Sequence, residues 1–86
     1  MNEELREAIR QAIAAELKLP VEVLHDDATV TSVGLDSLGL AQSVVAVEQA
    51  LAGEVDTEAL STRLAPEMTV ADLIAAIGAS LVSAPA

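Results

Sequence analysis

The sequence predicts an all-α fold: a four-helix bundle with a short third helix and a long loop between the first two helices. Apolar residues recur at helical spacings in the first, second and last of these segments. Strand-like alternation is not sustained anywhere, and the prolines fall outside the helical segments. A chain of 86 residues supports one domain, which we place at residues 1–82, followed by a flexible tail at 83–86.

The first helix is predicted over residues 2–18. Its apolar residues stand at steps of four: Leu5, Ile9, Ile13 and Leu17. Asn2 is the expected N-cap, and Glu3 and Glu4 fall in the first turn, where the helix dipole favours acids. Pro20 is expected to end the helix because proline pushes the preceding residue out of the α region.

Residues 20–35 form a long connection in which the helical period breaks down. Connections of this length inside a small domain are usually either functional or held down by their own apolar side chains. Five residues can provide that attachment: Val23, Leu24, Val30, Val33 and Leu35.

The second helix is predicted to open at Leu35-Asp36-Ser37-Leu38. Its apolar residues again keep helical spacing: Leu40, Val44, Val47 and Leu51. Gly53 is expected to close it, as a C-terminal glycine often does.

The third helix is predicted to be short. Asp56 or Thr57 can cap it, and it is expected to run through Leu60 to Leu64 and to stop at Pro66.

The last helix is predicted to begin at Thr69. The Thr69 hydroxyl can accept from the backbone N–H of Asp72, while the Asp72 carboxylate reaches back to the N-cap amide, which is the capping-box pattern. The expected buried stripe is Val70, Leu73, Ile74, Ile77 and Leu81.

Composition excludes several classes of function. Fourteen acids against four bases give a formal charge of −10, which repels phosphate backbones, and no aromatic ring is available to stack on bases, so nucleic-acid binding is not expected. Without cysteine and with a single histidine, the usual zinc sites cannot form, and Asp26-Asp27 lacks the ligand spacing of a calcium loop. No apolar run approaches the ~20 residues that span a bilayer, so we expect no membrane partner. We expect a cytoplasmic monomer that binds no metal.

The segment Gly34-Leu35-Asp36-Ser37-Leu38 is the strongest candidate for chemistry. Gly34 permits a tight turn and Asp36 can cap the following helix, which places Ser37 in the first helical turn. A phosphate attached there would meet free backbone N–H groups and the positive end of the helix dipole. Ser37 is therefore a suitable position for a phosphoester.

Ser37 is a poor candidate for a self-contained nucleophile. Such a serine needs a base within hydrogen-bond reach, and His25 is the one histidine in the chain. A hydrolase built from Ser37, His25 and an aspartate has little cleft available in so small a chain, and a solvated loop position is the simpler interpretation of His25.

The chain resembles the phosphopantetheine-dependent acyl carrier proteins. The resemblance rests on residues 34–38, on Val47-Glu48, on Leu51 and Gly53 at the end of the second helix, and on Thr69-Val70-Ala71-Asp72-Leu73. Together with the helix pattern it covers nearly the whole chain.

The resemblance implies a carrier with no catalytic residue and no turnover of its own. A phosphopantetheinyl transferase would use coenzyme A and Mg²⁺ to attach 4′-phosphopantetheine to Ser37, with Asp36 and Leu38 as flanking contacts. Acyl groups would then ride as thioesters on the thiol of the arm, which also accounts for a chain without cysteine. Further partners would be the acyl-loading, condensing or acyl-transfer enzymes of a synthase.

The chain departs from the family pattern in the helix after the serine. Family members commonly carry acids there, whereas residues 37–47 contain no charge. We therefore expect partners to contact Leu38, Leu40 and neighbouring apolar surface, with Glu48 supplying acid toward the far end of the helix. This favours polyketide or other specialised-metabolite biosynthesis over fatty-acid synthesis.

Two alternatives stay open from the sequence. One is a peptidyl carrier domain of a nonribosomal peptide synthetase, although such domains tend to show Gly-Gly before the serine, where this chain has Leu35-Asp36. The other is a non-catalytic helical adaptor in which Ser37 is only a helix residue. The segment at 53–69 is a few residues longer than in compact members of the family that the chain resembles. In that family the third helix borders the cleft where some carriers shelter the acyl chain, and the sequence leaves open whether this one does so.

Overall fold

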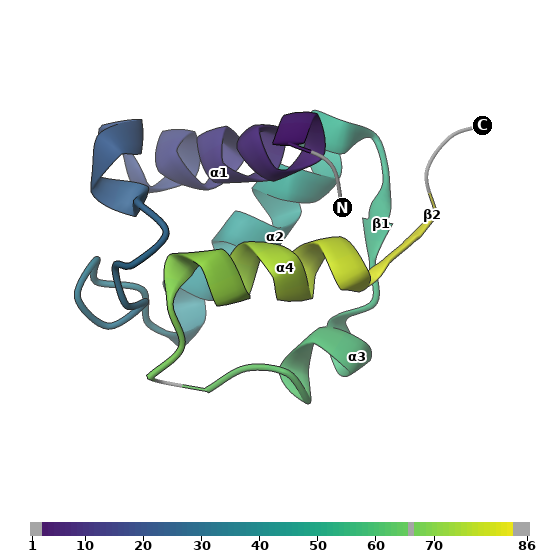
Figure 1. Ribbon diagram of the computed structural model, residues 1–86. Helices are drawn as coiled ribbons and strands as arrows, with labels where there is room; N and C mark the ends of the chain where they lie inside the picture. Colours follow the sequence, from purple (N-terminus) through teal and green to yellow (C-terminus); the bar gives the residue numbers. More distant parts are fainter. Residues whose placement is uncertain (1–2, 66, 84–86) are drawn as a thin grey trace.

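Four helices form a bundle in the computed structural model, which describes residues 3–65 and 67–83. The elements are α1 (Glu3–Leu17), the 3₁₀ helix η1 (Val21–Leu24), α2 (Ser37–Leu51), β1 (Glu54–Val55), α3 (Thr57–Ser61), α4 (Val70–Ala79) and β2 (Leu81–Ser83) (Figure 1). The predicted fold class, with its short third helix and long first loop, is confirmed. The expected N-cap Asn2 lies outside the described residues.

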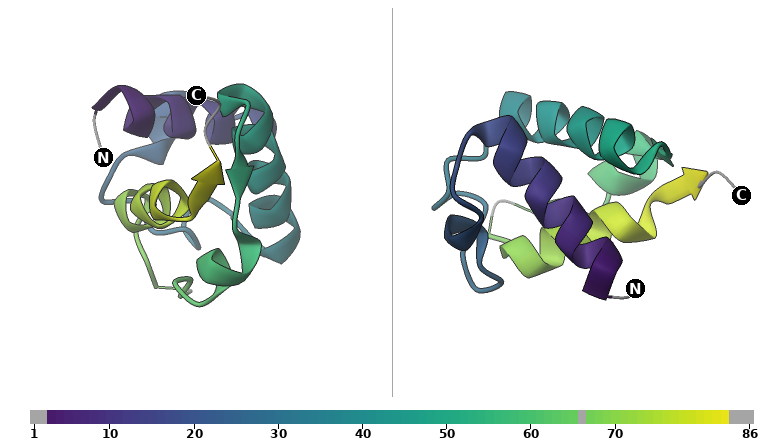
Figure 2. Two further views of the ribbon diagram at one scale, coloured as in Figure 1. Left: turned by 90° about the vertical axis from the view of Figure 1, so that its right-hand side faces the viewer. Right: turned by 90° about the horizontal axis from the view of Figure 1, so that it is seen from above.

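The core lies where α1 packs on both α2 and α4. The view from above in Figure 2 shows α1 crossing obliquely, with α2 on one side and α4 on the other. The apolar stripes that the sequence predicts meet here and bury the largest side chains: Ile9, Ile13, Val47, Val70, Leu73, Ile74 and Ile77. Because aliphatic burial stabilises by about 25 cal/mol per Å² of apolar surface, this three-helix contact is the main stabilising feature of the bundle.

Two helices end on left-handed residues that are not glycine. After α1, Lys18 has φ 57°, and the Leu19 N–H donates to the Ala14 carbonyl at 3.0 Å. After α2, Ala52 has φ 50°, and the Gly53 N–H donates to the Glu48 carbonyl at 3.1 Å. Both patterns satisfy the last carbonyls of the helix in the manner of a Schellman motif. Thus α1 ends before Pro20 can act, and the left-handed position after α2 belongs to Ala52, one residue before the expected Gly53.

Replacing Ala52 by glycine is expected to stabilise the protein by about 0.5–1 kcal/mol. Holding an L-residue in the left-handed region costs roughly 1–2 kcal/mol, and glycine avoids this cost. The greater conformational entropy of glycine in the unfolded state offsets roughly 0.5–1 kcal/mol of the stabilisation. Urea unfolding followed by far-ultraviolet circular dichroism measures the difference. Ala50→Gly, at an exposed position inside α2, is the matched control and should destabilise by about 1 kcal/mol. A loss of stability in Ala52→Gly would contradict the left-handed assignment.

The long loop at residues 20–35 is held against the start of α4. The Val30 N–H donates to the Met68 carbonyl at 3.0 Å, and the Val70 N–H donates to the Ala28 carbonyl at 2.7 Å. These bonds flank a β-bridge between Thr29 and Thr69.

The apolar residues of this loop behave largely as the sequence predicts. Leu24 and Val30 are buried and Val33 and Leu35 pack against the core, but Val23 is exposed, so its predicted role in holding the loop is wrong. The short η1 turn directs Leu24 inward and leaves Val23 on the outside.

Two arginines of α1 fasten the same loop from the other side. Arg10 donates to the Leu24 carbonyl and, at 2.6 Å, to Oδ1 of Asp26, and Arg6 lies 3.4 Å from the same oxygen. The hydrogen bond from Arg10, together with the positive charges of Arg10 and Arg6, holds the pKa of the Asp26 carboxyl below its ordinary value of 3.8 against the opposing effect of desolvation.

Asp26→Asn is expected to flatten the acid limb of the stability curve. Because the folded-state pKa of Asp26 lies below the unfolded-state value, its ionised form stabilises the fold above pH 3.8, and that contribution is lost as the pH falls through the lowered value. The variant should therefore be less stable than the wild type at neutral pH and approach it below pH 3.8. Unfolding free energies from neutral pH to about pH 2 test this. Asp27→Asn is the control, since Asp27 forms no ion pair with any described residue; parallel curves for the wild type and Asp26→Asn would refute the assignment.

A short antiparallel ribbon joins the segment after α2 to the segment after α4 (Figure 1). Glu54 pairs with Ser83 and Val55 with Leu81, and the Asp56 N–H donates to the Ser80 carbonyl at 2.7 Å. Leu81, predicted in the buried stripe of the last helix, is therefore in a strand instead. Ser83 is the last residue of β2, and the rest of the predicted tail lies outside the described residues.

Helix α3 is shorter than predicted. Asp56 caps it by accepting from the Ala59 N–H at 3.1 Å, as expected, but the helix ends at Ser61 rather than Leu64. The hydroxyls of Ser61 and Thr62 donate back to carbonyls of the same helix, which is a local bonding pattern that weakens helix continuation. Pro66, the expected stop, lies outside the described residues.

Candidate functional site

The N-terminal end of α2 has the geometry that the sequence predicts for it. Asp36 is the N-cap, with extended backbone (φ −103°, ψ −174°), and its Oδ1 accepts from the Gly39 N–H at 2.7 Å. Ser37 is therefore the first residue of the helix. Gly34 has φ 81°, a left-handed turn that suits glycine and leads the chain from the loop into the cap.

Small residues of α2 let this end of the helix pack closely. A Cβ at Gly39 would lie 3.2 Å from Oδ1 of Asp36 and 3.7 Å from a methyl of Leu17 in α1. Ser43, one turn further along, is fully buried, and its hydroxyl has no hydrogen-bond partner among the described residues. Both residues belong to the uncharged stretch at 37–47, and the structure shows that Gly39 and Ser43 allow close packing of this part of the helix.

The exposed side of α2 carries no charge. Leu38 is 67% exposed and Val45 is 51% exposed, and Ala41 and Gln42 are exposed at helical spacing from them. We call these four residues the uncharged face. Glu48 is the one charged residue of α2, and its Oε2 accepts from the Val55 N–H at 2.9 Å. Glu48, predicted as a partner contact, is thus bonded to β1 within the molecule.

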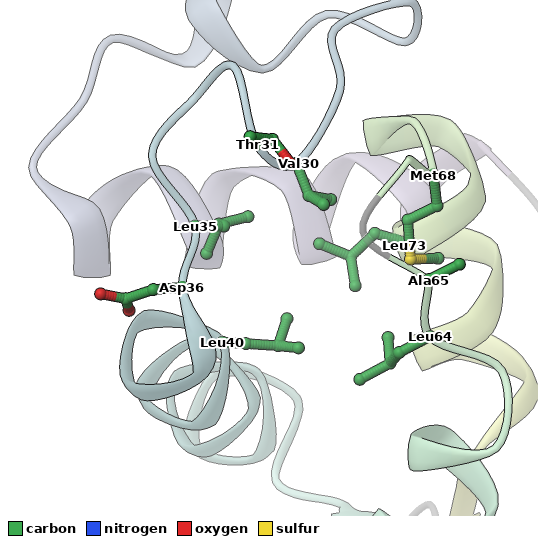
Figure 3. Close-up of a pocket in the computed structure, with 9 residues that line it drawn as sticks. All are labelled: Val30, Thr31, Leu35, Asp36, Leu40, Leu64, Ala65, Met68 and Leu73. Atoms are coloured by element: carbon green, nitrogen blue, oxygen red, sulfur yellow. The ribbon is translucent and has the colours of Figure 1, made fainter.

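A cavity of about 380 Å³, here called the loop cleft, opens beside Asp36 (Figure 3). It is bounded by the long loop, the start of α2 and the segment between α3 and α4. Its lining residues are Val30, Thr31, Leu35, Asp36, Leu40, Leu64, Ala65, Met68 and Leu73. Figure 3 shows the Asp36 carboxylate turned away from the cavity while the leucines point into it. The predicted contacts Asp36 and Leu40 thus border one cleft, whereas Leu38 lies on the outer surface.

His25, the base that a hydrolase would need, lies in the long loop directly after η1. His25 is exposed at the end of η1 and does not line the loop cleft. In the described part of the chain, no group of three or more His, Asp or Glu side chains could hold a metal ion. Nor does that part contain a helix both long and apolar enough to cross a membrane.

A family model described as the phosphopantetheine attachment site matches residues 7–77. The chain belongs to this family. The match runs from α1 through α4 and includes the Asp36-Ser37 cap and the whole loop cleft. Searches of the curated proteins and of the solved structures returned no match.

Membership of this carrier family confirms the cofactor that the resemblance implies. The domain is an attachment site for covalently bound 4′-phosphopantetheine, and such carriers work with phosphopantetheinyl transferases and synthase enzymes. Carrier domains of this family are generally non-catalytic. The start of α2 fits the group, because a helix N-terminus favours a phosphate.

The loop cleft itself was not found by sequence reasoning. Its walls come from two stretches that lie far apart in the chain, residues 30–40 and 64–73, so no local motif marks them. The available signal was the apolar content of the long loop and of the segment after α3, namely Val30, Leu35, Leu64 and Met68.

Proposed function

We propose that the protein is an acyl carrier protein whose phosphopantetheine arm is attached to Ser37. In the attachment step the Ser37 hydroxyl oxygen bonds to the phosphorus of the phosphopantetheine group of coenzyme A. The bond from that phosphorus to adenosine 3′,5′-bisphosphate breaks, and the hydroxyl proton passes to the transferase or to water. The observation that carries this proposal is the position of Ser37, the first residue of α2 directly after the capping Asp36, within the matched family region.

Intact-mass measurement tests the proposal directly. The protein is incubated with coenzyme A, Mg²⁺ and a broad-specificity phosphopantetheinyl transferase, and the modified peptide is mapped by tandem mass spectrometry. We expect the mass of one phosphopantetheine group on the peptide that contains Ser37. A reaction without coenzyme A is the blank. If several transferases add no mass, the proposal is wrong, and the helical adaptor becomes the better reading.

We further propose that this carrier serves polyketide or other specialised-metabolite biosynthesis. Two features support this. The uncharged face differs from the acidic helix that the family resemblance associates with basic partners, and Asp36 stands where peptidyl carriers tend to have glycine. Loading enzymes, condensing enzymes and acyl transferases of a synthase are then the partners that act on the arm.

Partners of this carrier are proposed to dock on the uncharged face. An enzyme that acts at Ser37 must cover the start of α2, and the exposed side chains nearest along that helix are Leu38, Ala41 and Gln42. Since the carboxylate of Glu48 is bonded to β1, the free surface of α2 offers apolar contact and amide hydrogen bonds rather than ion pairs.

Leu38→Glu and Val45→Glu are each expected to lower kcat/KM for the transferase about tenfold, because losing one buried aliphatic contact of about 1.5 kcal/mol corresponds to that factor. The wild-type rate should change less than about twofold when salt is raised well above physiological strength, because contacts without charge pairs are not screened. Val23→Glu, at an exposed valine of η1, is the control and should leave the rate unchanged. A steep fall with salt would contradict the uncharged interface.

A further inference from the structure

Two hydrogen bonds from α2 to Asp36 span the backbone that carries Ser37. The Leu40 N–H donates to the Asp36 carbonyl at 2.9 Å, and the Gly39 N–H donates to Oδ1 of Asp36 at 2.7 Å. Both bonds start one residue before Ser37 and end after it, so Ser37 lies inside the rings that they close. The first turn of α2 therefore keeps its shape only while the Asp36 side chain stays in place.

Gly39 leaves the room that this side chain occupies. A Cβ at Gly39 would lie 3.2 Å from Oδ1 of Asp36, 3.6 Å from a methyl of Leu35 and 3.7 Å from a methyl of Leu17. The first distance is shorter than an ordinary van der Waals contact, so a larger residue must push the carboxylate aside. Glycine is also among the poorest residues for a helix interior, so helix propensity does not account for its presence here.

The Asp36 carboxylate could assist attachment in two different ways. Its charge could meet a basic group of the transferase, or its oxygen could fix the start of α2 as a hydrogen-bond acceptor. The structure favours the second role, because Oδ1 is already used within the chain at the short distance of a charge-assisted bond. Residues 37–47 carry no charge, so no neighbouring acid on this part of α2 would join Asp36 in attracting a cation.

We propose that Asp36 and Gly39 are positioning residues for the loading of Ser37. Asp36 acts through the cap bond rather than through its charge, and Gly39 provides the space that the bond needs. This inference rests on the proposed attachment at Ser37. Loss of a cap lowers the ratio of ordered to frayed helix start by about fivefold. A frayed first turn leaves the Ser37 oxygen without a fixed place relative to the phosphorus of coenzyme A, and such misplacement slows a transfer step.

Three substitutions of Asp36 separate the cap from the charge. Asp36→Asn keeps a good capping residue without the charge, Asp36→Glu keeps the charge on a residue type that caps poorly, and Asp36→Ala removes both. The measurement is kcat/KM of a broad-specificity phosphopantetheinyl transferase with coenzyme A and Mg²⁺, followed by intact mass. We expect Asp36→Asn to stay within about twofold of the wild type. Asp36→Glu and Asp36→Ala should each fall about fivefold.

Amide hydrogen exchange of Gly39 reports on the cap without any transferase. Its N–H is the donor of the cap bond, so its exchange rate follows the opening of that bond. NMR on the unmodified protein should show exchange close to the wild-type rate in Asp36→Asn. Exchange should be about fivefold faster in Asp36→Glu and Asp36→Ala, in the same order as the loading rates.

A double-mutant cycle tests whether Gly39 acts through Asp36. Gly39→Ala alone is expected to lower kcat/KM by about twofold to fivefold, because the new Cβ crowds Oδ1 of Asp36. In the Asp36→Ala background the crowded oxygen is absent, so Gly39→Ala should add no further loss. Equal losses in both backgrounds would show that Gly39 acts independently of the cap and would overturn its part of the proposal.

Asp56→Ala is the matched control for a loss of stability. Asp56 caps α3 in the same way, with its Oδ1 accepting from the Ala59 N–H at 3.1 Å. The variant loses a cap of the same type on a different helix, so it should load at the wild-type rate. If it loads as slowly as Asp36→Ala, general destabilisation explains both results and the positioning role is overturned.

Failure of this inference is distinguishable from failure of the proposed function. If the wild-type protein gains no mass, attachment at Ser37 fails and the inference fails with it. If the wild type loads but Asp36→Asn is no faster than Asp36→Glu, the carrier function stands and the cap assignment is overturned. A rate that Asp36→Glu retains and Asp36→Asn loses would assign Asp36 to direct charge contact with the transferase instead.

Discussion

Ser37→Ala is expected to abolish phosphopantetheinylation completely while leaving the fold intact. The phosphoester needs a hydroxyl oxygen, which alanine lacks, so no partial activity should survive. Ser37 is the first residue of α2, and alanine is the most favourable helix residue, so the helix itself should not suffer. Intact mass after incubation with transferase, coenzyme A and Mg²⁺ gives the result, and circular dichroism verifies that the variant is folded.

Ser43→Ala is the matched control for this experiment. It removes a serine hydroxyl from the same helix, but that hydroxyl is fully buried and out of reach of any enzyme. Loading should therefore equal that of the wild type. Mass gain that persists in Ser37→Ala would move the attachment point to another residue, and the argument from the start of α2 would be wrong.

Leu73→Ala is expected to cost about 2–5 kcal/mol of unfolding free energy, the usual range for removing a fully buried leucine side chain. Leu73 is 0% exposed and packs where α4 meets the rest of the core, and it also forms the inner wall of the loop cleft. Domains of this length have a total stability of roughly 4–13 kcal/mol, so the variant should approach the threshold of unfolding at ordinary temperature. Urea titration followed by far-ultraviolet circular dichroism measures it, since the chain has no tyrosine or tryptophan to serve as a probe.

Leu38→Ala is the corresponding control on an exposed leucine. At 67% exposure its truncation should change stability by no more than about 0.5 kcal/mol. The contrast between the two leucines is the real test, because the chemical change is identical and the burial differs. Similar losses in both variants would show that the assigned core is wrong.

Features that depend on residues close in sequence could be predicted from the sequence. The cap at Asp36 and the capping box of Thr69 and Asp72 join residues three apart, and all their predicted bonds are present. The apolar stripes of α1 and α4 follow from helical period alone. Because the cap at Asp36 is local in this sense, the sequence also predicted that Ser37 lies at the start of a helix.

Features that depend on distant partners could not be predicted. The ribbon of β1 and β2 is too short to show an alternating apolar pattern in the sequence. It forms because the chain that leaves α4 runs beside β1, so that Leu81 pairs with Val55. The left-handed Ala52 offers no sequence signal when a glycine stands next to it. Glu48 looked available to partners because nothing local shows that the Val55 N–H lies within its reach.

The bridge between Thr29 and Thr69 also constrains the order of assembly. Helices form within microseconds, whereas contacts between distant segments wait for the intervening chain to be placed, at an entropic cost that grows with its length. The contact between the loop and the start of α4 closes the stretch of chain that contains α2 and α3, so we expect the loop cleft, whose walls lie on both sides of this contact, to form later than the helices. We therefore expect the start of α2, where Ser37 lies, to form before the loop cleft beside it.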